Sequence, residues 1–256
     1  MPTVKTARGD IYYAKHHKLD NPYTPVMMIH GAGGTHLDWS PHIRKLKEAN
    51  AIVPDLLGHG KSGNIGHNSI RDYAQDIIAL ADILQIEQFI PCGHSMGGAI
   101  AQQIVLDYPK RIKSLILIAT GAKLSVHPEI LDGVMKDYEN VAHLLVDSFW
   151  SEQTGDDIQN LSYEALINGS PQILYDDFLA CNQFDVRKQL SQIDVPTLII
   201  GGTEDKMTPM KYSAYLADNI PNAELTVVQD AGHMVHLEQP ITVGNAIKAW
   251  LNQIQQ

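Results

Sequence analysis

Short apolar segments alternate with amphipathic segments along most of this sequence, and this alternation restricts the fold more than any other feature. Turn residues end six apolar runs, which are predicted as strands: "PVMMIHG", "AIVPD", "QFIPCG", "SLILIATG", "PTLIIGG" and "ELTVVQDAG". Four helical patterns accompany them: "SIRDYAQDIIALADILQI", "GGAIAQQIVLDY", "MKYSAYLADNI" and "ITVGNAIKAWLNQI". Strands that are apolar throughout are typical of a sheet buried on both faces. The sequence therefore predicts an α/β fold, with a mostly parallel sheet and helices on both faces.

The alternation is interrupted once, between residues 123 and 190. That stretch contains helical patterns rich in aromatic and acidic residues, but no convincing buried strand. We therefore predict a core formed by residues 1–122 and 191–256, and a small helical cap inserted at residues 123–190. Near the N-terminus, "TVKTA" and "IYYAKH" flank an Arg8-Gly9-Asp10 turn, which predicts a hairpin.

Composition excludes several classes of function. With 256 residues, 44% of them hydrophobic, the chain suits one substantial core. The formal net charge of −10 disfavours nucleic-acid binding, which needs clustered Lys and Arg. No apolar run is long enough for a membrane span, and the N-terminus lacks the apolar core of a signal peptide, so a cytoplasmic protein is expected. The two cysteines, Cys92 and Cys181, are expected to be reduced thiols.

A serine lies between glycines where a strand is predicted to give way to a helix. In "CGHSMGG", Gly93 and Gly97 are each two residues from Ser95. A sharp strand-to-helix turn crowds its neighbours, which the glycines relieve, and it exposes the central hydroxyl at the carboxyl edge of the sheet. The free N–H of Met96, at the start of the helix, is expected to stabilise an oxyanion formed beside Ser95. This pattern predicts a nucleophilic serine.

A serine hydroxyl needs a base, and the base needs an acid that orients it. Of twelve histidines, we choose His233 in "VVQDAGHMVHLEQP", because it follows the last predicted strand. For the acid we choose Asp205 in "PTLIIGGTEDKMTP", with Asp230 as a rival. His236 could pair with His233 in a metal site, but no third ligand group accompanies them, so neither a metal nor an organic cofactor is expected. His94 is expected to be a packed or hydrogen-bonded neighbour of the site.

The segments "HGAGGTHLDW", "VPDLLGHGKSG", "GHSMGG", "GGTEDKMTP" and "AGHMVHLEQP" resemble those of α/β-hydrolases, in the branch that holds serine esterases, enol-lactonases, C–C bond hydrolases and perhydrolases. The resemblance covers essentially the whole chain. It implies that the residue after the His-Gly pair, Ala32, supplies the second oxyanion donor, with Gly33 as a less favoured choice. "GAGGTH" and "DLLGHGKS" only approximate phosphate-binding motifs, and Asp55 and His59 are expected instead to hold a loop beside the site.

These residues predict hydrolysis of a small carboxylic ester through an acyl-enzyme on Ser95. Lactone opening, C–C cleavage and perhydrolysis use the same three side chains and stay open, as does a hydrolase-fold receptor that turns its ligand over slowly. The expected partner is a small-molecule acyl substrate, and a homo-oligomer is compatible with the sequence. Four aromatic residues of the insertion are candidates for an apolar substrate pocket: Phe149, Trp150, Tyr175 and Phe178.

Overall fold

The computed structural model describes residues 2–16, 22–63 and 65–255. Eight strands form one sheet in the order β1-β2-β4-β3-β5-β6-β7-β8. Their bounds are β1 Thr3–Lys5, β2 Asp10–Lys15, β3 Val26–Ile29, β4 Ile52–Pro54, β5 Ile90–His94, β6 Leu115–Ile118, β7 Thr197–Gly202 and β8 Ala223–Val228. The β1–β2 and β2–β4 pairs are antiparallel, and the other neighbours pair in parallel. The predicted hairpin and the predicted mostly parallel sheet are both confirmed.

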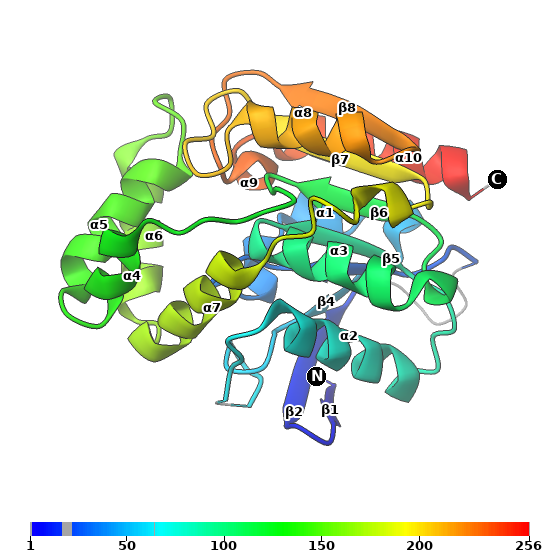
Figure 1. Ribbon diagram of the computed structural model, residues 1–256, viewed down its shortest axis with the longest axis horizontal. Coiled ribbons are helices and arrows are strands. Elements are labelled where there is room, and N and C mark those ends of the chain that lie inside the picture. Colours follow the sequence, from blue (N-terminus) through cyan, green and yellow to red (C-terminus); the bar gives the residue numbers. More distant parts are fainter. Residues whose placement is uncertain (1, 17–21, 64, 256) are drawn as a thin grey trace.

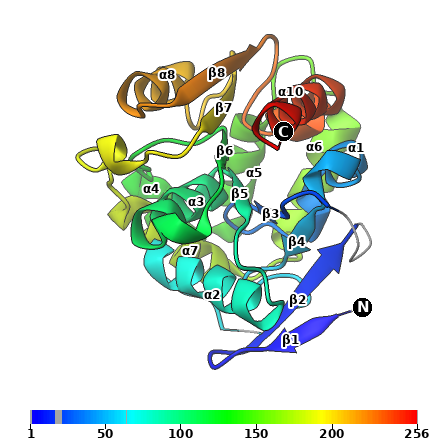
Figure 2. The same ribbon diagram turned by 90° about the vertical axis from the view of Figure 1, so that its right-hand side faces the viewer.

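Helices cover both faces of the sheet. The helices of the core are α1 Pro41–Arg44, α2 Ile70–Ile83, α3 Met96–Asp107, α8 Met210–Asn219, α9 Val235–Glu238 and α10 Pro240–Ile254. Figure 2 shows α2, α3 and α8 on one side of the strands, and α1 and α10 on the other. None of the helices in the described part of the chain combines the length and apolarity that a bilayer crossing needs.

Strand β3 illustrates why the strands read as continuous apolar runs. Met27 and Ile29 belong to the apolar cluster under α2, α3 and α8, whereas Val26 and Met28 belong to the cluster under α1 and α10. Side chains along a strand alternate between faces, so a sheet that is covered twice buries every position. All four side chains are fully buried.

Four further helices form between β6 and β7: α4 Pro128–Val134, α5 Tyr138–Phe149, α6 Asp156–Ile167 and α7 Pro171–Gln183. We call them the cap helices. They lie together beyond one end of the sheet, at the left of Figure 1. Their own apolar cluster packs against residues of α9 and of the loops that follow β3, β7 and β8: Ala32, Met207, Met234 and Leu237. The cap helices therefore cover the carboxyl ends of the parallel strands, where ligands bind in sheets of this type.

Candidate active site

Ser95 lies at a sharp turn between β5 and α3. Its backbone has φ 53° and ψ −117°, a conformation that side-chain-bearing residues adopt only under strain. The flanking glycines are required by close backbone contacts. A Cβ on Gly93 would lie 2.0 Å from the carbonyl oxygen of Gly97, and a Cβ on Gly97 would lie 2.2 Å from that of Ile29. The glycine spacing thus has the physical cause that the sequence suggested, and the turn presents Ser95 at the carboxyl edge of the sheet.

Asp205 and His233 form a hydrogen-bonded pair from the loops after β7 and β8. His233 Nδ1 lies 3.0 Å from Asp205 Oδ2 and 3.1 Å from Oδ1, and both residues are buried. Asp205 also accepts hydrogen bonds from the Met207 and Thr208 N–H groups and from the Thr208 hydroxyl. Burial acts to raise the pKa of Asp205, but the charge of His233 and these hydrogen bonds lower it overall. Asp205 is therefore a carboxylate at neutral pH and holds the proton of His233 on Nδ1.

The structure favours Asp205 over Asp230 as the acid, and it shows what the side chains of His94 and His236 contact. Asp230 is exposed, and its described contact is a backbone hydrogen bond to Thr203 Oγ1. His94 donates from Nε2 to the carbonyl oxygen of His233 at 2.9 Å, so it is a hydrogen-bonded neighbour of the site. His236 is buried against His94, with ring centroids 4.3 Å apart. Burial and the neighbouring His236 and His233 lower the pKa of His94, which is therefore neutral.

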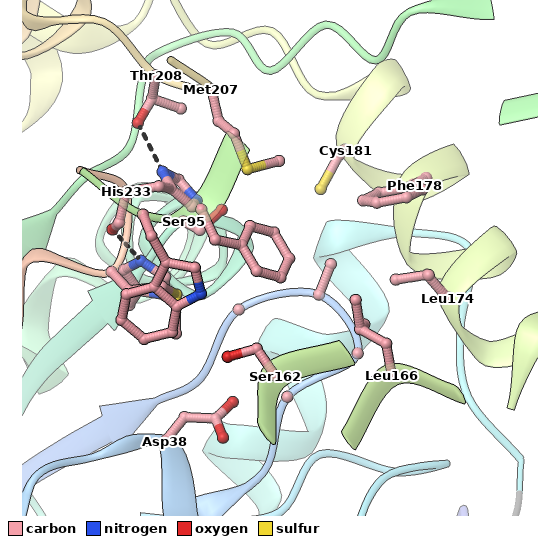
Figure 3. A pocket seen from close by; sticks show the side chains of 18 of the residues that line it. Asp38, Ser95, Ser162, Leu166, Leu174, Phe178, Cys181, Met207, Thr208 and His233 are labelled. Atoms are coloured by element: carbon pink, nitrogen blue, oxygen red, sulfur yellow. Dashed lines mark hydrogen bonds between the residues drawn. The ribbon is translucent and has the colours of Figure 1, made fainter. Parts of the chain in front are cut away.

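Ser95 and His233 line one cavity of about 330 Å³ between the sheet and the cap helices. Figure 3 shows the two side chains next to each other at one end of it, with Leu166, Leu174 and Phe178 at the other end. The structure therefore brings together all three residues that we selected as nucleophile, base and acid. Because Asp205 occupies Nδ1 of His233, the nitrogen that remains for the serine proton is Nε2.

Backbone N–H groups from the loop after β3 and from the start of α3 lie beside Ser95. Gly33 donates its N–H to a carboxylate oxygen of Asp177 at 2.8 Å, so it is not available to a substrate. Ala32 lines the cavity, and its N–H donates to no described residue. The N–H of Met96 is the first of α3 and has no partner within the helix, while the Met96 side chain is buried in the core. Ala32 and Met96 thus keep the free donors that an oxyanion needs.

Three of the four aromatic residues predicted for the pocket line the cavity: Phe149, Trp150 and Phe178. Tyr175 does not, and the prediction for this residue is wrong. Leu174, Phe178 and Cys181 face the cavity from α7, spaced about one helical turn apart, which turns Tyr175 toward the apolar cluster of the cap. Both cysteines are free and buried, as expected.

Sequence reasoning missed the contribution of α6 and of Asp38. Helix α6 presents one face to the cavity: Ile158, Leu161, Ser162, Ala165 and Leu166. Their helical spacing in the sequence indicates that they share one face of a helix. Which way that face points depends on how the cap packs against the core. Asp38 is the only Asp or Glu among the lining residues, which include neither Lys nor Arg. Burial raises the pKa of Asp38 to about 6.

Asp55 holds the loop after β4, as the sequence suggested. Its carboxylate accepts from the His36 N–H and ring Nδ1 and from the Lys61 N–H. His59, in the same loop, contacts the cap: its Nε2 lies 2.8 Å from Asp177 Oδ2. Its role therefore extends beyond the loop.

An eight-stranded, mostly parallel sheet with a Gly-x-Ser-x-Gly turn at its carboxyl edge defines the α/β-hydrolase class of fold. The chain belongs to the alpha/beta hydrolase family, whose sequence model matches residues 26–245. It is 28% identical over 236 residues to 3-oxoadipate enol-lactonase 2 of Acinetobacter baylyi, and the match covers 88% of each chain.

Two solved structures share the fold over nearly the whole chain. Est816, an N-acyl homoserine lactone degrading enzyme, superposes with a TM-score of 0.85 at 27% identity, covering 97% of this chain and 100% of Est816. A thermophilic esterase superposes with a TM-score of 0.84 at 28% identity, covering 99% of this chain and 97% of the esterase. The protein is thus an enzyme of the hydrolase class, as its resemblance to the family implied.

Proposed function

We propose that this hydrolase cleaves small, uncharged carboxylic esters through an acyl-enzyme on Ser95. The observation that carries the proposal is the Asp205–His233 pair, whose Nδ1 to Oδ2 distance is 3.0 Å and whose imidazole lines the same cavity as Ser95. A hydroxyl on a strained turn next to an oriented imidazole is the arrangement that activates serine for acyl transfer.

In the proposed mechanism, Ser95 Oγ attacks the acyl carbon while His233 Nε2 takes the hydroxyl proton. The negative oxygen that forms accepts hydrogen bonds from the N–H groups of Ala32 and Met96. His233 then donates its proton to the departing alkoxide oxygen, and the acyl group stays on Ser95. Water enters, gives a proton to His233 and attacks the acyl carbon, and the proton returns to Ser95 as the carboxylic acid leaves. Asp205 stays ionised throughout and stabilises the imidazolium.

The residues that line the cavity favour an uncharged substrate. Its wall is mainly apolar and aromatic, and no Lys or Arg lines it. An anionic acyl group would lose its hydration there without gaining a cationic partner, and it would meet the carboxyl of Asp38. A cavity of about 330 Å³ is at the small end of ligand pockets.

The test is a substrate panel. Acetyl, butyryl and octanoyl p-nitrophenyl esters, neutral lactones, a dienoic C–C substrate and a carboxylate-bearing ester are each followed under steady-state conditions. We expect repeated turnover of the shorter neutral esters, and a kcat/KM at least about tenfold lower for the anionic ester, a difference of about 1.4 kcal/mol. Background rates on every ester together with cleavage of the C–C substrate would reject ester hydrolysis. A single slow burst without further turnover would indicate a receptor.

Lactone opening is the second candidate, and a specific observation favours it. A 3-oxoadipate enol-lactonase and an N-acyl homoserine lactone degrading enzyme are each 27% or 28% identical to this chain. The chemistry differs from ester hydrolysis only in that the leaving alkoxide stays attached to the acyl group. The neutral lactones of the panel decide between the two by comparison of kcat/KM.

The Thr208 hydroxyl is expected to orient Asp205. Thr208→Val removes the hydrogen bond to Asp205 Oδ2, 2.7 Å long, and the longer contact of the same hydroxyl with His233 Nδ1, at 3.4 Å. It leaves the two backbone donors to Asp205 Oδ1 in place. Since a charge-assisted hydrogen bond is worth about 1.5–3 kcal/mol, and part of it is replaced by the remaining donors, kcat for butyryl ester hydrolysis should fall about tenfold. Thr203→Val is the matched control, because Thr203 Oγ1 contacts the Asp230 N–H instead. Equal kcat values for the two variants would contradict the prediction.

A further inference from the structure

A fully buried carboxylate on the cap joins four segments of the chain. Asp177 of α7 accepts at Oδ2 from the Gly33 N–H and from His59 Nε2, each at 2.8 Å. At Oδ1 it accepts from the Tyr73 hydroxyl at 2.7 Å. Gly33 lies in the loop after β3, His59 in the loop after β4 and Tyr73 in α2. One side chain of the cap is thus bonded to three separate parts of the core.

His59 is positively charged in this arrangement. Its Nε2 faces the carboxylate of Asp177, and its Nδ1 lies 3.1 Å from the carbonyl oxygen of Leu57. Both neighbours are acceptors, so each ring nitrogen carries a proton. Burial acts to lower the pKa of His59, but the carboxylate of Asp177 raises it overall. Asp177 and His59 therefore form a buried ion pair, in which each charge needs the other.

The ion pair bears directly on the loop that carries the proposed oxyanion donor. Gly33 has φ +66°, and a Cβ added to it would lie 3.1 Å from Leu174 of α7, so the cap helix packs closely on this loop. The Gly33 N–H points to Asp177, and Ala32, directly before it, keeps its N–H free on the cavity wall. Fixing the peptide group after Ala32 restricts the backbone rotation that would turn the Ala32 N–H away from the cavity.

We propose that Asp177 and His59 are positioning residues, through which the cap holds the Ala32 N–H in place for the oxyanion. The proposal rests on the acyl chemistry proposed above for Ser95. Neither residue lines the cavity, so neither touches the substrate. A displaced donor weakens binding of the oxyanion, which exists only in the transition state, and leaves binding of the neutral ester nearly unchanged. A pair that only stabilised the fold would lower the melting temperature without this difference.

The test compares Asp177→Asn with Tyr73→Phe. The Asn variant keeps the shape and removes the charge that holds His59. The Phe variant removes the two hydrogen bonds of the Tyr73 hydroxyl, to Asp177 Oδ1 and from the His67 N–H, and leaves the ion pair in place. For each variant and for the wild type, we would measure kcat and KM for hydrolysis of the butyryl ester. We would also measure the inhibition constant of an arylboronic acid and the melting temperature. The boronic acid forms a tetrahedral adduct with the serine, so its affinity reports the oxyanion site directly.

We expect Asp177→Asn to lower kcat by about 10- to 100-fold, because complete loss of one oxyanion donor costs about 10²–10³. The affinity of the boronic acid should weaken by the same factor, whereas KM should change less than about threefold. For Tyr73→Phe, we expect kcat, KM and the inhibition constant of the boronic acid to stay within about threefold of wild type. An Asn variant with unchanged kcat, or with a lower kcat and unchanged boronic acid affinity, overturns the proposal.

A second variant and a measurement on the wild-type protein also test the proposal. If Asp177→Asn does not fold, His59→Gln takes its place, because it removes the positive charge and retains a donor for Asp177, and the same result is expected of it. Hydrogen exchange of the Gly33 amide in the wild-type protein is a measurement that needs no variant. Strong protection is expected, and exchange as fast as in an exposed loop would reject the bond on which the proposal rests. Wild-type protein without ester turnover would reject the proposed function instead.

Discussion

Ser95→Ala is expected to lower kcat/KM for butyryl ester hydrolysis by about 10⁴- to 10⁶-fold. The variant lacks the oxygen on which we propose that the acyl-enzyme forms, so His233 and Asp205 have no nucleophile to activate. The oxyanion donors and the cavity remain, and these sustain only a small acceleration over the uncatalysed reaction. The measurement is steady-state hydrolysis of the p-nitrophenyl ester, with mass spectrometry of the intact protein to detect acylation of the wild type during turnover.

Ser162→Ala is the matched control for this variant. Ser162 lines the same cavity from α6, and its hydroxyl donates to the Ile158 carbonyl oxygen within the helix. Its loss should change kcat/KM less than about threefold, since a hydrogen bond of this kind contributes little. Retention of more than a few per cent of wild-type activity by Ser95→Ala, or acylation elsewhere in the chain, would exclude Ser95 as the nucleophile.

The free energy of unfolding should fall by about 4 kcal/mol between pH 7 and pH 5, because three buried histidines stay neutral in the folded protein. Burial, followed by the charge of His59, lowers the pKa of His30 to about 4. Burial, followed by the charge of His233, lowers that of His236 to about 3, and His94 is lowered in the same direction. An unfolded histidine titrates near its ordinary pKa, so acid protonates the unfolded chain first, and stability is lost as the pH falls below about 6.5.

Each of these histidines accounts for about 2 kcal/mol over that interval, and two groups oppose them. The pKa of Asp38 is raised to about 6, so the folded protein takes up a proton there that the unfolded chain does not, which offsets about 1 kcal/mol. His59, whose pKa is raised by Asp177, acts in the same direction. The net effect is still a lower free energy of unfolding at pH 5 than at pH 7.

Urea unfolding at pH 7, 6 and 5 measures this effect, and His236→Phe supplies the control. The His236 ring packs between those of Trp39 and His94, and its described polar interaction is with the backbone of Asp38, so a phenyl ring should replace it with a small loss at pH 7. The variant should lose about 2 kcal/mol less than wild type between pH 7 and pH 5, because one titrating group is gone. Equal losses in the two proteins would contradict the assignment of His236.

The parts of the site that follow strands could be predicted from the sequence. Ser95, Asp205 and His233 come directly after apolar runs, and parallel strands direct their carboxyl ends to one edge, so position along the chain translates into position in space. The glycine spacing around Ser95 reports backbone contacts that only glycine tolerates. Such local signals need no knowledge of tertiary packing.

The contributions of the cap could not be predicted in the same way. Tyr175 and Phe178 are equally plausible as pocket residues from composition, and only the rotation of α7 against the core separates them. Asp177 and His59 are 118 residues apart, and no short pattern announces their contact. Their pairing depends on how the inserted helices dock, which is decided by many small packing contacts distributed over the surface of the cap.

Because the cap helices are inserted between β6 and β7, we expect that substrate choice can be changed separately from the chemistry proposed for Ser95. The pairing of β5 to β8 places the loops that carry Ser95, Asp205 and His233 at one edge of the sheet, and these pairings do not involve the cap helices. A graft of a foreign cap should therefore transfer substrate choice while the reaction is preserved, provided that the donor brings an acidic side chain to meet His59. Without that acidic side chain, the chimera would bury the charged imidazolium of His59 unpaired between the core and the foreign cap.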